Sequence, residues 1–524
     1  MDFLDPLLLA RWQFGLTTLY HFIFVPLTLG MSLFVAIFQT MWFRTADAKW
    51  LHLTRFFGKI FLINFAMGIV TGIVQEFQFG MAWSDYSRFV GDVFGAPLAM
   101  EALLAFFIES TFLGLWIFGW DRLPKKLHLG VLWAAVIGSI LSAYFIIVAN
   151  SWMQHPVGIE LVNGRPRMND AWAVFTNNTA LVAYPHVIAG SFAVGAALLV
   201  GVAWYHLWRR RADGVDTVDA DGRVIVGDHP EIPGRDKTDH TVWIKSLRIG
   251  AVVAIVAGIA VAITGDQQAK LMFQQQPMKM ASAEAACENG GALSILTIGN
   301  LRSNSCDDVT TLIAIPGLLS FLAHGDFDTD VKGVSDLVPI YQERYGTNLP
   351  DDPRLGARAG QEINYVPLMP VTYWGFRAMI GFGIISMFGG ILAWWLTRKG
   401  TVPSATWLMR LGVAAILLPF IANASGWIFT EMGRQPFVVA PNPTGIDGVF
   451  MFTAAAVSPG VSAGEILFSL VALTLVYGAL ALVEIGLIRK YTRGGVPSAM
   501  PELVQHEPTP EERRKADDVL AFAY

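Results

Sequence analysis

Nine long apolar stretches dominate this sequence of 524 residues. They lie near residues 16–40, 56–80, 97–119, 128–150, 180–207, 246–266, 374–397, 405–430 and 462–488. Each is long enough for an α-helix to cross the hydrocarbon core of a membrane, which takes roughly 20 apolar residues. The composition agrees, because 54% of the residues are hydrophobic and only 15% are charged, unlike those of a soluble globular chain. The sequence therefore predicts an all-α integral membrane protein with nine transmembrane helices.

Lysine and arginine residues indicate the orientation of these helices, because they accumulate in short cytoplasmic loops. They cluster in alternate connections and after the last stretch, near residues 44–59, 122–126, 209–211, 245–248, 398–410 and 489–493. We therefore expect the N-terminus outside and the C-terminus in the cytoplasm. The start of the chain, MDFLDPLLLA, lacks the basic region of a removable signal peptide, so the first helix is expected to direct its own insertion.

This topology divides the chain into four parts. Residues 1–266 hold helices one to six, 267–373 form a long extracytoplasmic loop, 374–490 hold helices seven to nine, and 491–524 form a cytoplasmic tail. The segment 212–241 is an acidic cytoplasmic insertion that we expect to be solvated surface. The formal net charge of −5 argues against a nucleic-acid partner.

The long loop is expected to be ordered, because loops of this length are usually functional or disordered and this one is apolar enough to pack. Its segment LTIGNLR is typical of a strand. The loop also holds both cysteines, Cys287 and Cys306. An oxidising compartment favours a disulfide between them, which would contribute roughly 3 kcal/mol to stability; two free thiols are the alternative.

Few potential metal ligands lie in the apolar stretches, and they gather near one membrane face. With a rise of about 1.5 Å per residue, His21 lies shallow from the outside, while His186 and Met379 share a depth about two turns below the outer surface. Imidazole and thioether are the axial pair of a low-spin, electron-transferring haem. The alternative is that Met379 fills space and that each histidine bonds a neighbouring helix.

Acidic residues lie in two of these helices. Glu431 and Arg434, in the segment WIFTEMGRQPF, share one helix face and either pair with each other or bind a haem iron and a haem propionate. Glu101 and Glu109 stand about 12 Å apart along the third helix. Acids at successive depths in a membrane helix are typical of a proton relay. The alternative is a purely structural role, in which a neighbouring Ser or Trp caps each of these stepped acids.

Several motifs together resemble subunit I of the cytochrome bd quinol oxidases. They are RWQFGLTTLYHFIFVPLTLGM, GAPLAMEALLAFFIESTFLGLWIFGWDRL, LSAYFIIVANSWMQHP, QPMKMASAEA, FRAMIGFG and GRQPF, and the resemblance runs from residue 11 to about residue 490. The chain departs from the family pattern in GRQPF, which more often ends in Trp, in the longer insertion 212–241, and in the cysteine pair, which we do not expect in every member. The resemblance implies a quinol:oxygen oxidoreductase of the bacterial cell membrane that uses two b-type haems and one d-type haem. It would add to the proton-motive force by proton uptake from the cytoplasm, without pumping.

The resemblance also implies roles for the candidate haem ligands. His186 and Met379 match the axial ligands of the low-spin haem b, with Arg377 beside them favouring its reduced state. His21 matches a ligand of haem d and Glu431 that of the high-spin haem b, although these two assignments can be exchanged. Arg434 would hold a haem propionate.

Other residues are implied to handle quinol and protons. Lys279 and Glu284 match the residues for quinol oxidation, and we expect them on one face of a short helix. Glu101 resembles a residue at the high-spin haems and Glu109 a member of the proton route. Menaquinol is the favoured substrate beside dioxygen. A second large membrane subunit is implied as partner, with room for small single-helix accessory subunits.

Two other classes of protein share some of these signs. A secondary transporter or ion channel also has many helices and stepped acids, but the sequence shows no inverted repeat, and its candidate ligands gather near one face instead of the midplane. A membrane anchor for another haem protein would leave the stepped acids and the segment from Lys279 to Glu284 without a role.

Overall fold

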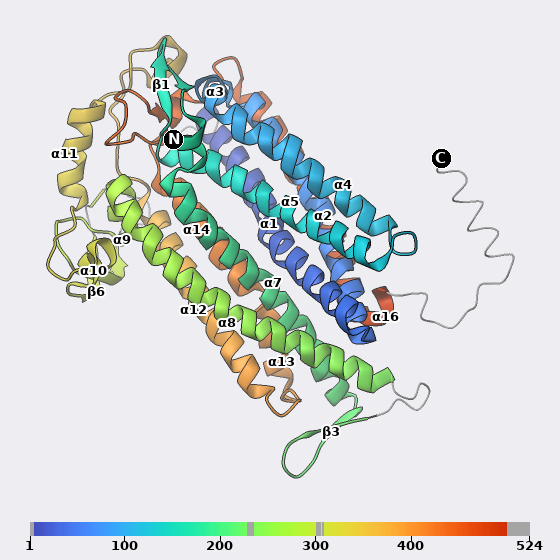
Figure 1. Ribbon diagram of the computed structural model, residues 1–524. Helices are drawn as coiled ribbons and strands as arrows, with labels where there is room; N and C mark the ends of the chain where they lie inside the picture. The colour runs from blue at the N-terminus through green and yellow to red at the C-terminus, as the bar shows by residue number, and fades with distance from the viewer. Residues whose placement is uncertain (1–4, 228–234, 300–304, 307–308, 500–524) are drawn as a thin grey trace.

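A computed structural model describes residues 5–227, 235–299, 305–306 and 309–499 of the chain. Within these residues, nine helical segments are long and apolar enough to cross a membrane (Figure 1). They span Pro6–Thr45, Ala48–Met81, Ser84–Phe118, Lys125–Gln154, Ala171–Ala212, Asp239–Gln275, Met369–Leu396, Thr406–Gly433 and Ala463–Gly494. The predicted fold class and the nine spans are therefore confirmed.

Most spans are single helices. These are α1 (Pro6–Thr45), α2 (Ala48–Met81), α5 (Lys125–Gln154), α8 (Arg235–Gln275), α12 (Met369–Leu396) and α15 (Ala463–Gly494), while the short α6 (Ala171–Phe175) precedes α7 (Asn178–Ala212). The eighth span consists of α13 (Thr406–Ala414) and α14 (Leu417–Gly433), and α16 (Val496–Ala499) follows the last span. Helix α8 continues past residue 266, where its apolar stretch ends, because the polar residues that follow still favour a helix.

The third span has an irregular middle. Helix α3 (Ser84–Met100) passes into a π-helical segment, η1 (Glu101–Phe106), before α4 (Phe107–Phe118) continues to the end. Such wide turns are rare and are frequent at functional sites. This one begins at Glu101, one of the two acids that the sequence singled out.

Side chains at the helix starts explain several of these boundaries. Asp5, Asp47 and Asn177 each accept a hydrogen bond from a backbone N–H in the first turn of α1, α2 and α7. Ser462 and Glu465 form a reciprocal capping box at the start of α15. Such caps satisfy N–H groups that have no partner inside the helix.

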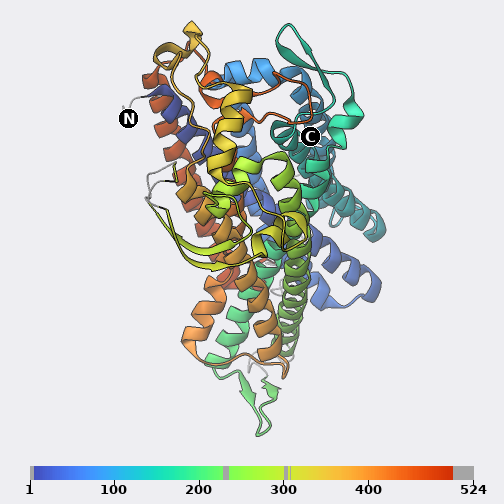
Figure 2. The ribbon, with the colours of Figure 1, turned by 90° about the vertical axis from the view of Figure 1, so that its left-hand side faces the viewer.

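The strands form four antiparallel hairpins outside the long helices. They are β1 (Ile159–Val162) with β2 (Arg165–Met168), β3 (Asp216–Val218) with β4 (Val224–Val226), β5 (Leu293–Ile298) with β6 (Thr310–Ile315), and β7 (Phe437–Val439) with β8 (Met451–Phe452). Figures 1 and 2 place the β1–β2 hairpin at one end of the helix bundle and the β3–β4 hairpin at the opposite end.

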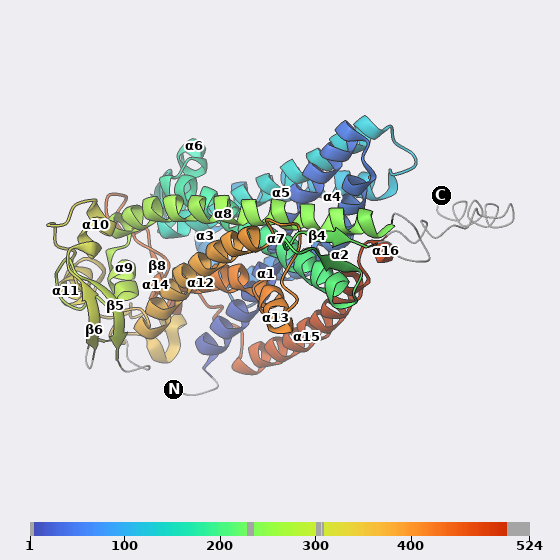
Figure 3. The same cartoon turned by 90° about the horizontal axis from the view of Figure 1, so that it is seen from below.

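The predicted extracytoplasmic loop folds into several short elements. It contains the helices α9 (Pro277–Glu284), α10 (Leu318–His324) and α11 (Val334–Tyr345), the 3₁₀ turn η2 (Pro353–Arg358) and the β5–β6 hairpin. A second 3₁₀ turn, η3 (Thr453–Ala455), lies outside this loop and follows β8. Figure 3 shows the loop elements gathered beyond the ends of α8 and α12. The predicted strand LTIGNLR is confirmed for its first three residues, which end β5, while residues 300–302 lie outside the described part.

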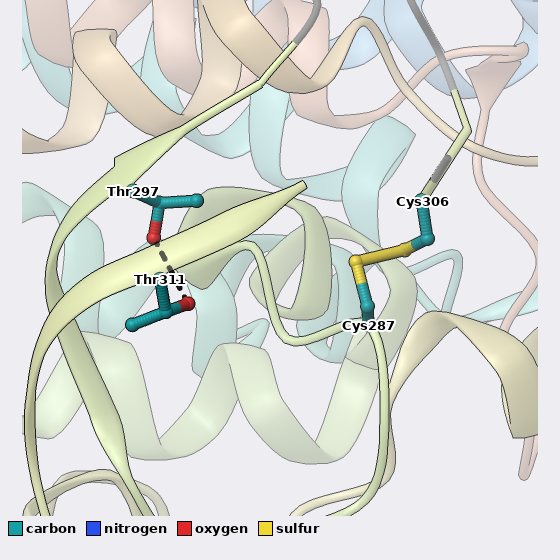
Figure 4. Close-up of a disulfide and its surroundings, with 4 residues drawn as sticks. All are labelled: Cys287, Thr297, Cys306 and Thr311. Carbon is teal, nitrogen blue, oxygen red and sulfur yellow. Dashed lines mark hydrogen bonds between the residues drawn. A yellow bond between two sulfur atoms is a disulfide. The ribbon is translucent and has the colours of Figure 1, made fainter. Parts of the chain in front are cut away.

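The predicted disulfide is present. Cys287 and Cys306 are joined, with their Cα atoms 5.6 Å apart (Figure 4). In the adjoining hairpin, the hydroxyl oxygens of Thr297 and Thr311 lie 3.3 Å apart across the two strands (Figure 4). The loop is therefore tied together by a covalent bond as well as by strand pairing.

Most described residues of the acidic insertion are exposed or half-buried, as expected, but the expectation that it is solvated surface is wrong for Asp216. This side chain is only 4% exposed, and both its oxygens accept hydrogen bonds of 2.8 Å from Arg210 at the end of α7. His240 in α8 lies 3.1 Å from the same carboxylate. Burial alone would raise the pKa of Asp216, but the hydrogen bonds from His240 and Arg210 lower it to about 2. The β3–β4 hairpin is thus fastened to two helices.

Candidate functional site

Both candidate histidines are held by the helix next to their own. His21 lies in α1, and its Nδ1 is 2.9 Å from the hydroxyl oxygen of Thr71 in α2. His186 lies in α7, and its Nδ1 is 3.1 Å from the hydroxyl oxygen of Thr264 in α8. With Nδ1 engaged, Nε2 is the nitrogen that each ring can offer to an iron.

Met379 in α12 lies against α14. A Cβ added to Gly426 would come within 2.7 Å of its sulfur, so the absence of a side chain at Gly426 makes room for the thioether. Helix α14 also reaches α7, because the side-chain nitrogen of Asn423 lies 3.5 Å from the carbonyl of Gly190. The elements that carry His186 and Met379 are therefore packed around the same helix.

Glu431 and Arg434 form the pair that their spacing predicted. A nitrogen of Arg434 donates to one oxygen of Glu431, and the amide of Asn150 in α5 donates to the other at 3.0 Å. Arg434 is only 5% exposed, yet its Nε and one terminal nitrogen have no hydrogen-bond partner among the residues that the structure describes. An unsatisfied buried guanidinium is costly, so these atoms suit an anionic group of a ligand, such as a propionate.

A line of hydrogen bonds continues from Glu431 into the loop. The amide of Gln154 donates to Asn150 at 2.9 Å, and the ammonium group of Lys279 donates to Gln154 at 2.6 Å. Asn150 and Gln154 are four residues apart, so they share one face of α5. Lys279, Gln154, Asn150 and Glu431 therefore form one polar network although 281 residues separate Asn150 from Glu431.

Burial governs the charge of Lys279. This side chain is 2% exposed. Burial and, to a smaller extent, the positive charge of Arg434 together lower the pKa of Lys279 to about 7, although Glu431 opposes the shift. A small cavity beside the side chain is lined by Tyr341, Tyr365 and Gly433, among others.

Glu284 occupies a different environment from Lys279. It is 3% exposed and lies 3.0 Å from a nitrogen of Arg377 in α12. Burial raises the pKa of Glu284, and the guanidinium of Arg377 opposes that shift. The expectation that Lys279 and Glu284 share one face of α9 is wrong, because five residues of α-helix turn through roughly 500°, which leaves them about 140° apart.

Arg377 is held by the loop through both of its terminal nitrogens. Besides Glu284, it donates to the carbonyl oxygens of Ala283, at 2.7 Å, and of Ser294. Its guanidinium also lies 3.4 Å above the ring centre of Tyr373. Arg377 therefore joins α12, which carries Met379, to α9 and the β5–β6 hairpin.

The two stepped acids each have a serine partner in α5. The hydroxyl of Ser142 donates to Glu101 at 2.7 Å, and that of Ser139 donates to Glu109 at 2.5 Å. Glu109 is 7% exposed, and its backbone lies so close to α5 that a Cβ on Gly138 would come within 2.8 Å of it. The capping by serine that the sequence left open is therefore present at both acids.

Sequence reasoning missed the partners of the candidate residues. Ser139 and Ser142 stand three residues apart in an apolar helix, which is a readable sign of a polar face. Thr71 and Thr264 each precede a glycine within an apolar helix, and only the packing of the helices reveals their partners. Asn150 and Gln154 lie in VANSWMQHP, a motif that contributes to the family resemblance but from which the sequence predicts no role for these two residues.

These donors fit haem as a cofactor. Haem irons are bound by groups such as the two imidazoles held at Nδ1, the thioether with space around its sulfur, and the carboxylate of Glu431. A haem propionate is suited by the free nitrogens of the arginine beside that carboxylate. The donor groups thus match haem in their chemical type.

Comparisons with known proteins agree with this picture. The family described as cytochrome bd terminal oxidase subunit I matches residues 9–496. Cytochrome bd ubiquinol oxidase subunit 1 of Bacillus subtilis (strain 168) is 40% identical over 492 residues, which cover 94% of each protein. Cytochrome bd-II ubiquinol oxidase subunit 1 of Escherichia coli (strain K12) is 32% identical over 539 residues, which cover 95% of this chain and 98% of that protein.

A solved structure is similar as well. The bd oxidase of Geobacillus thermodenitrificans matches with a TM-score of 0.75 and 28% identity, over 94% of this chain and all of its own. Since the family match spans nearly the whole sequence and both relatives cover it almost from end to end, the chain belongs to the family of subunit I of cytochrome bd terminal oxidases, which confirms both the resemblance and the predicted enzyme class.

Proposed function

We propose that this chain oxidises quinol at the outer face of the bacterial cell membrane and carries the haems at which dioxygen is reduced to water. The observation that supports this most is the hydrogen-bonded line from Lys279 through Gln154 and Asn150 to Glu431. It links the residues expected to handle quinol with a carboxylate expected to bind haem.

His186 and Met379 would bind a low-spin haem b, and Arg377 would favour its reduced state. His21 would bind haem d and Glu431 a high-spin haem b, or the reverse, with Arg434 on a propionate. When bound, the two b-type haems and the d-type haem supply one-electron carriers and an iron position open to dioxygen. The chain's own contribution is to fix these groups and to exclude water around them.

Lys279 and Glu284 are proposed to hold the quinol, which is menaquinol in our assignment. Each quinol gives up two protons and two electrons, and an uncharged Lys279 would accept a proton from one hydroxyl. Because Lys279 and Glu284 lie on different sides of α9, we propose that quinol contacts this helix at its Lys279 side and that Glu284 acts from the Arg377 side.

Protons for oxygen reduction are proposed to come from the cytoplasm. Glu109 and Glu101, with Ser139 and Ser142, form two steps along the third and fourth spans. Reduction of one dioxygen consumes four electrons, which come from quinol at the outer face, and four protons from the cytoplasm. The reaction would then separate charge across the membrane without a proton pump. This direction requires the N-terminus outside and the C-terminus inside, as the distribution of lysine and arginine predicts.

The proposed complex contains a second large membrane subunit and leaves room for small single-helix subunits. Large apolar side chains such as Phe468, Leu475 and Leu482 on α15 are 69–77% exposed, which suits contact with lipid or with another membrane subunit.

Spectra of the purified complex test this function. Redox difference spectra of the wild type are compared with those of Met379→Leu and His21→Ala. We expect Met379→Leu to lose the low-spin b signal selectively and His21→Ala to lose a high-spin signal. A wild-type complex that contains no haem, or that consumes no oxygen when given quinol, would overturn the proposal.

A further inference from the structure

The two histidines are supported by the same pair of residues. In α2, Thr71 lies 2.9 Å from Nδ1 of His21, and a Cβ on the next residue, Gly72, would come within 3.1 Å of the Cε1 atom of the ring. Carbon atoms normally approach to about 3.5–4.0 Å. The hydroxyl therefore holds the imidazole at Nδ1, and the glycine leaves space beside Cε1 of the ring.

The second histidine repeats this arrangement. In α8, Thr264 lies 3.1 Å from Nδ1 of His186, and a Cβ on Gly265 would come within 3.2 Å of Cε1. In both cases a threonine–glycine pair on one helix faces a histidine on the preceding transmembrane helix. The two sites share no residues, so they are independent occurrences of one arrangement.

Other hydrogen bonds of the threonines indicate which nitrogen carries the hydrogen. The hydroxyl of Thr71 also lies 2.9 Å from the carbonyl of Met67, and that of Thr264 lies 2.7 Å from the carbonyl of Ala260. A hydroxyl has one hydrogen and two lone pairs, and a carbonyl can only accept. Each threonine therefore donates to its own helix and accepts from Nδ1–H of the histidine, which leaves the lone pair on Nε2.

We propose that Thr71 and Thr264 are positioning residues that fix the tautomer and the ring orientation of the two haem-binding histidines, with Gly72 and Gly265 providing the space. The proposal rests on the proposed function. An acceptor at Nδ1–H makes an imidazole a stronger donor to iron and favours the oxidised metal. Loss of the threonine hydroxyl should therefore raise the midpoint potential of the haem on that histidine and loosen its binding.

The test uses the complete oxidase complex with Thr71→Val or Thr264→Val, since valine keeps the shape of threonine without the hydroxyl. Redox titrations followed at the separate haem bands give the potentials, and haem content after washing gives retention. We expect Thr264→Val to raise the potential of the low-spin b haem alone and Thr71→Val to raise that of one high-spin haem alone. Retention of the affected haem should fall about 10- to 100-fold.

Several variants control this test. Thr71→Ser and Thr264→Ser keep the hydroxyl and should restore the wild-type potentials. Thr54→Val removes a buried hydroxyl of α2 that bonds only to its own helix, at 2.7 Å from the carbonyl of Trp50, and should change no potential. Gly80→Ala, where a Cβ would meet nothing within 4 Å, should leave the spectra unchanged, whereas Gly72→Ala should disturb one high-spin haem.

The possible failures can be told apart. If both valine variants keep every potential and all haem while His21→Ala and His186→Ala lose their signals, the positioning role is wrong and the proposed function stands. If the wild-type complex itself contains no haem, the proposed function is wrong. A potential that changes equally at all haems in either valine variant would also contradict the positioning role, because it would indicate a general disturbance.

Discussion

Two glutamate–arginine pairs in this molecule look alike, each with one buried and one half-buried partner, but they are built differently. Arg434 lies three residues after its partner Glu431 at the end of α14, and two of its nitrogens have no hydrogen bond within the described part of the chain. Arg377 meets Glu284 across 93 residues of sequence and also bonds two backbone carbonyls. Among the described residues, the first arginine keeps two nitrogens free for a ligand, whereas the second donates from both of its terminal nitrogens to the loop. This difference predicts that Arg434 binds a ligand directly, whereas Arg377 holds α9 and the β5–β6 hairpin to α12 and acts on the neighbouring haem only through its charge.

The largest effect is expected from Arg434→Met. The change removes the free donors and leaves the half-buried Glu431 without its cationic partner. We expect at least a tenfold loss of haem and of oxygen consumption, measured by haem extraction and with an oxygen electrode. Asp216→Asn, which breaks another buried arginine pair at the far end of the bundle, is the matched control and should retain its haem. Full haem content in Arg434→Met would refute the comparison.

Arg377→Met should have the next largest effect, and on a different step. Loss of this arginine frees α9 from α12, so we expect about a tenfold lower kcat/KM for quinol with haem content retained. An artificial electron donor that reduces the haems without the quinol site should support nearly normal oxygen consumption. An equal loss with both donors would show that Arg377 serves the haem directly.

The rate of quinol oxidation is expected to depend on pH through Lys279, which belongs to the same hydrogen-bonded network as the Glu431–Arg434 pair. Because its pKa is lowered to about 7, Lys279 is charged below this pH and neutral above it. Only the neutral amine accepts a proton, so quinol oxidation should rise several-fold as the pH increases through 7. Lys279→Met should flatten this part of the pH profile of kcat/KM. A profile identical to that of the wild type would exclude Lys279 as the base.

The smallest effect is expected from the disulfide. Its reduction, or the double change Cys287→Ser and Cys306→Ser, removes a constraint on the loop, but Arg377 still fastens α9. Because the disulfide limits the motion of the loop that carries the proposed quinol site, we expect its loss to lower kcat/KM for quinol about twofold and to make proteolysis of the loop faster. Unchanged kinetics would dismiss the idea that the disulfide rigidifies the quinol site.

Much of the fold was predictable because the membrane dictates it. A chain that crosses a hydrocarbon layer needs long apolar helices, and these are visible in the sequence. Pairing within one helix was also predictable, as Glu431 and Arg434 demonstrate.

Contacts between helices were not predictable, because they depend on the rotation of each helix about its axis. The partnerships of Glu284 with Arg377 and of Glu109 with Ser139 follow only from the packing. The same holds for Asp216, whose partners Arg210 and His240 come from two helices. Hydropathy alone assigned its acidic segment to the solvent.

The π-helical turn that begins at Glu101 has a consequence for how this chain can vary. An unbroken α-helix would rotate Glu109 about 80° away from Glu101, since eight residues make about 2.2 turns. The wider turn takes up extra residues, and both acids meet serines of α5. Deleting a single residue between 101 and 106 would restore regular winding and turn one acid away from its serine. The segment therefore tolerates changes of side chain far better than changes of length.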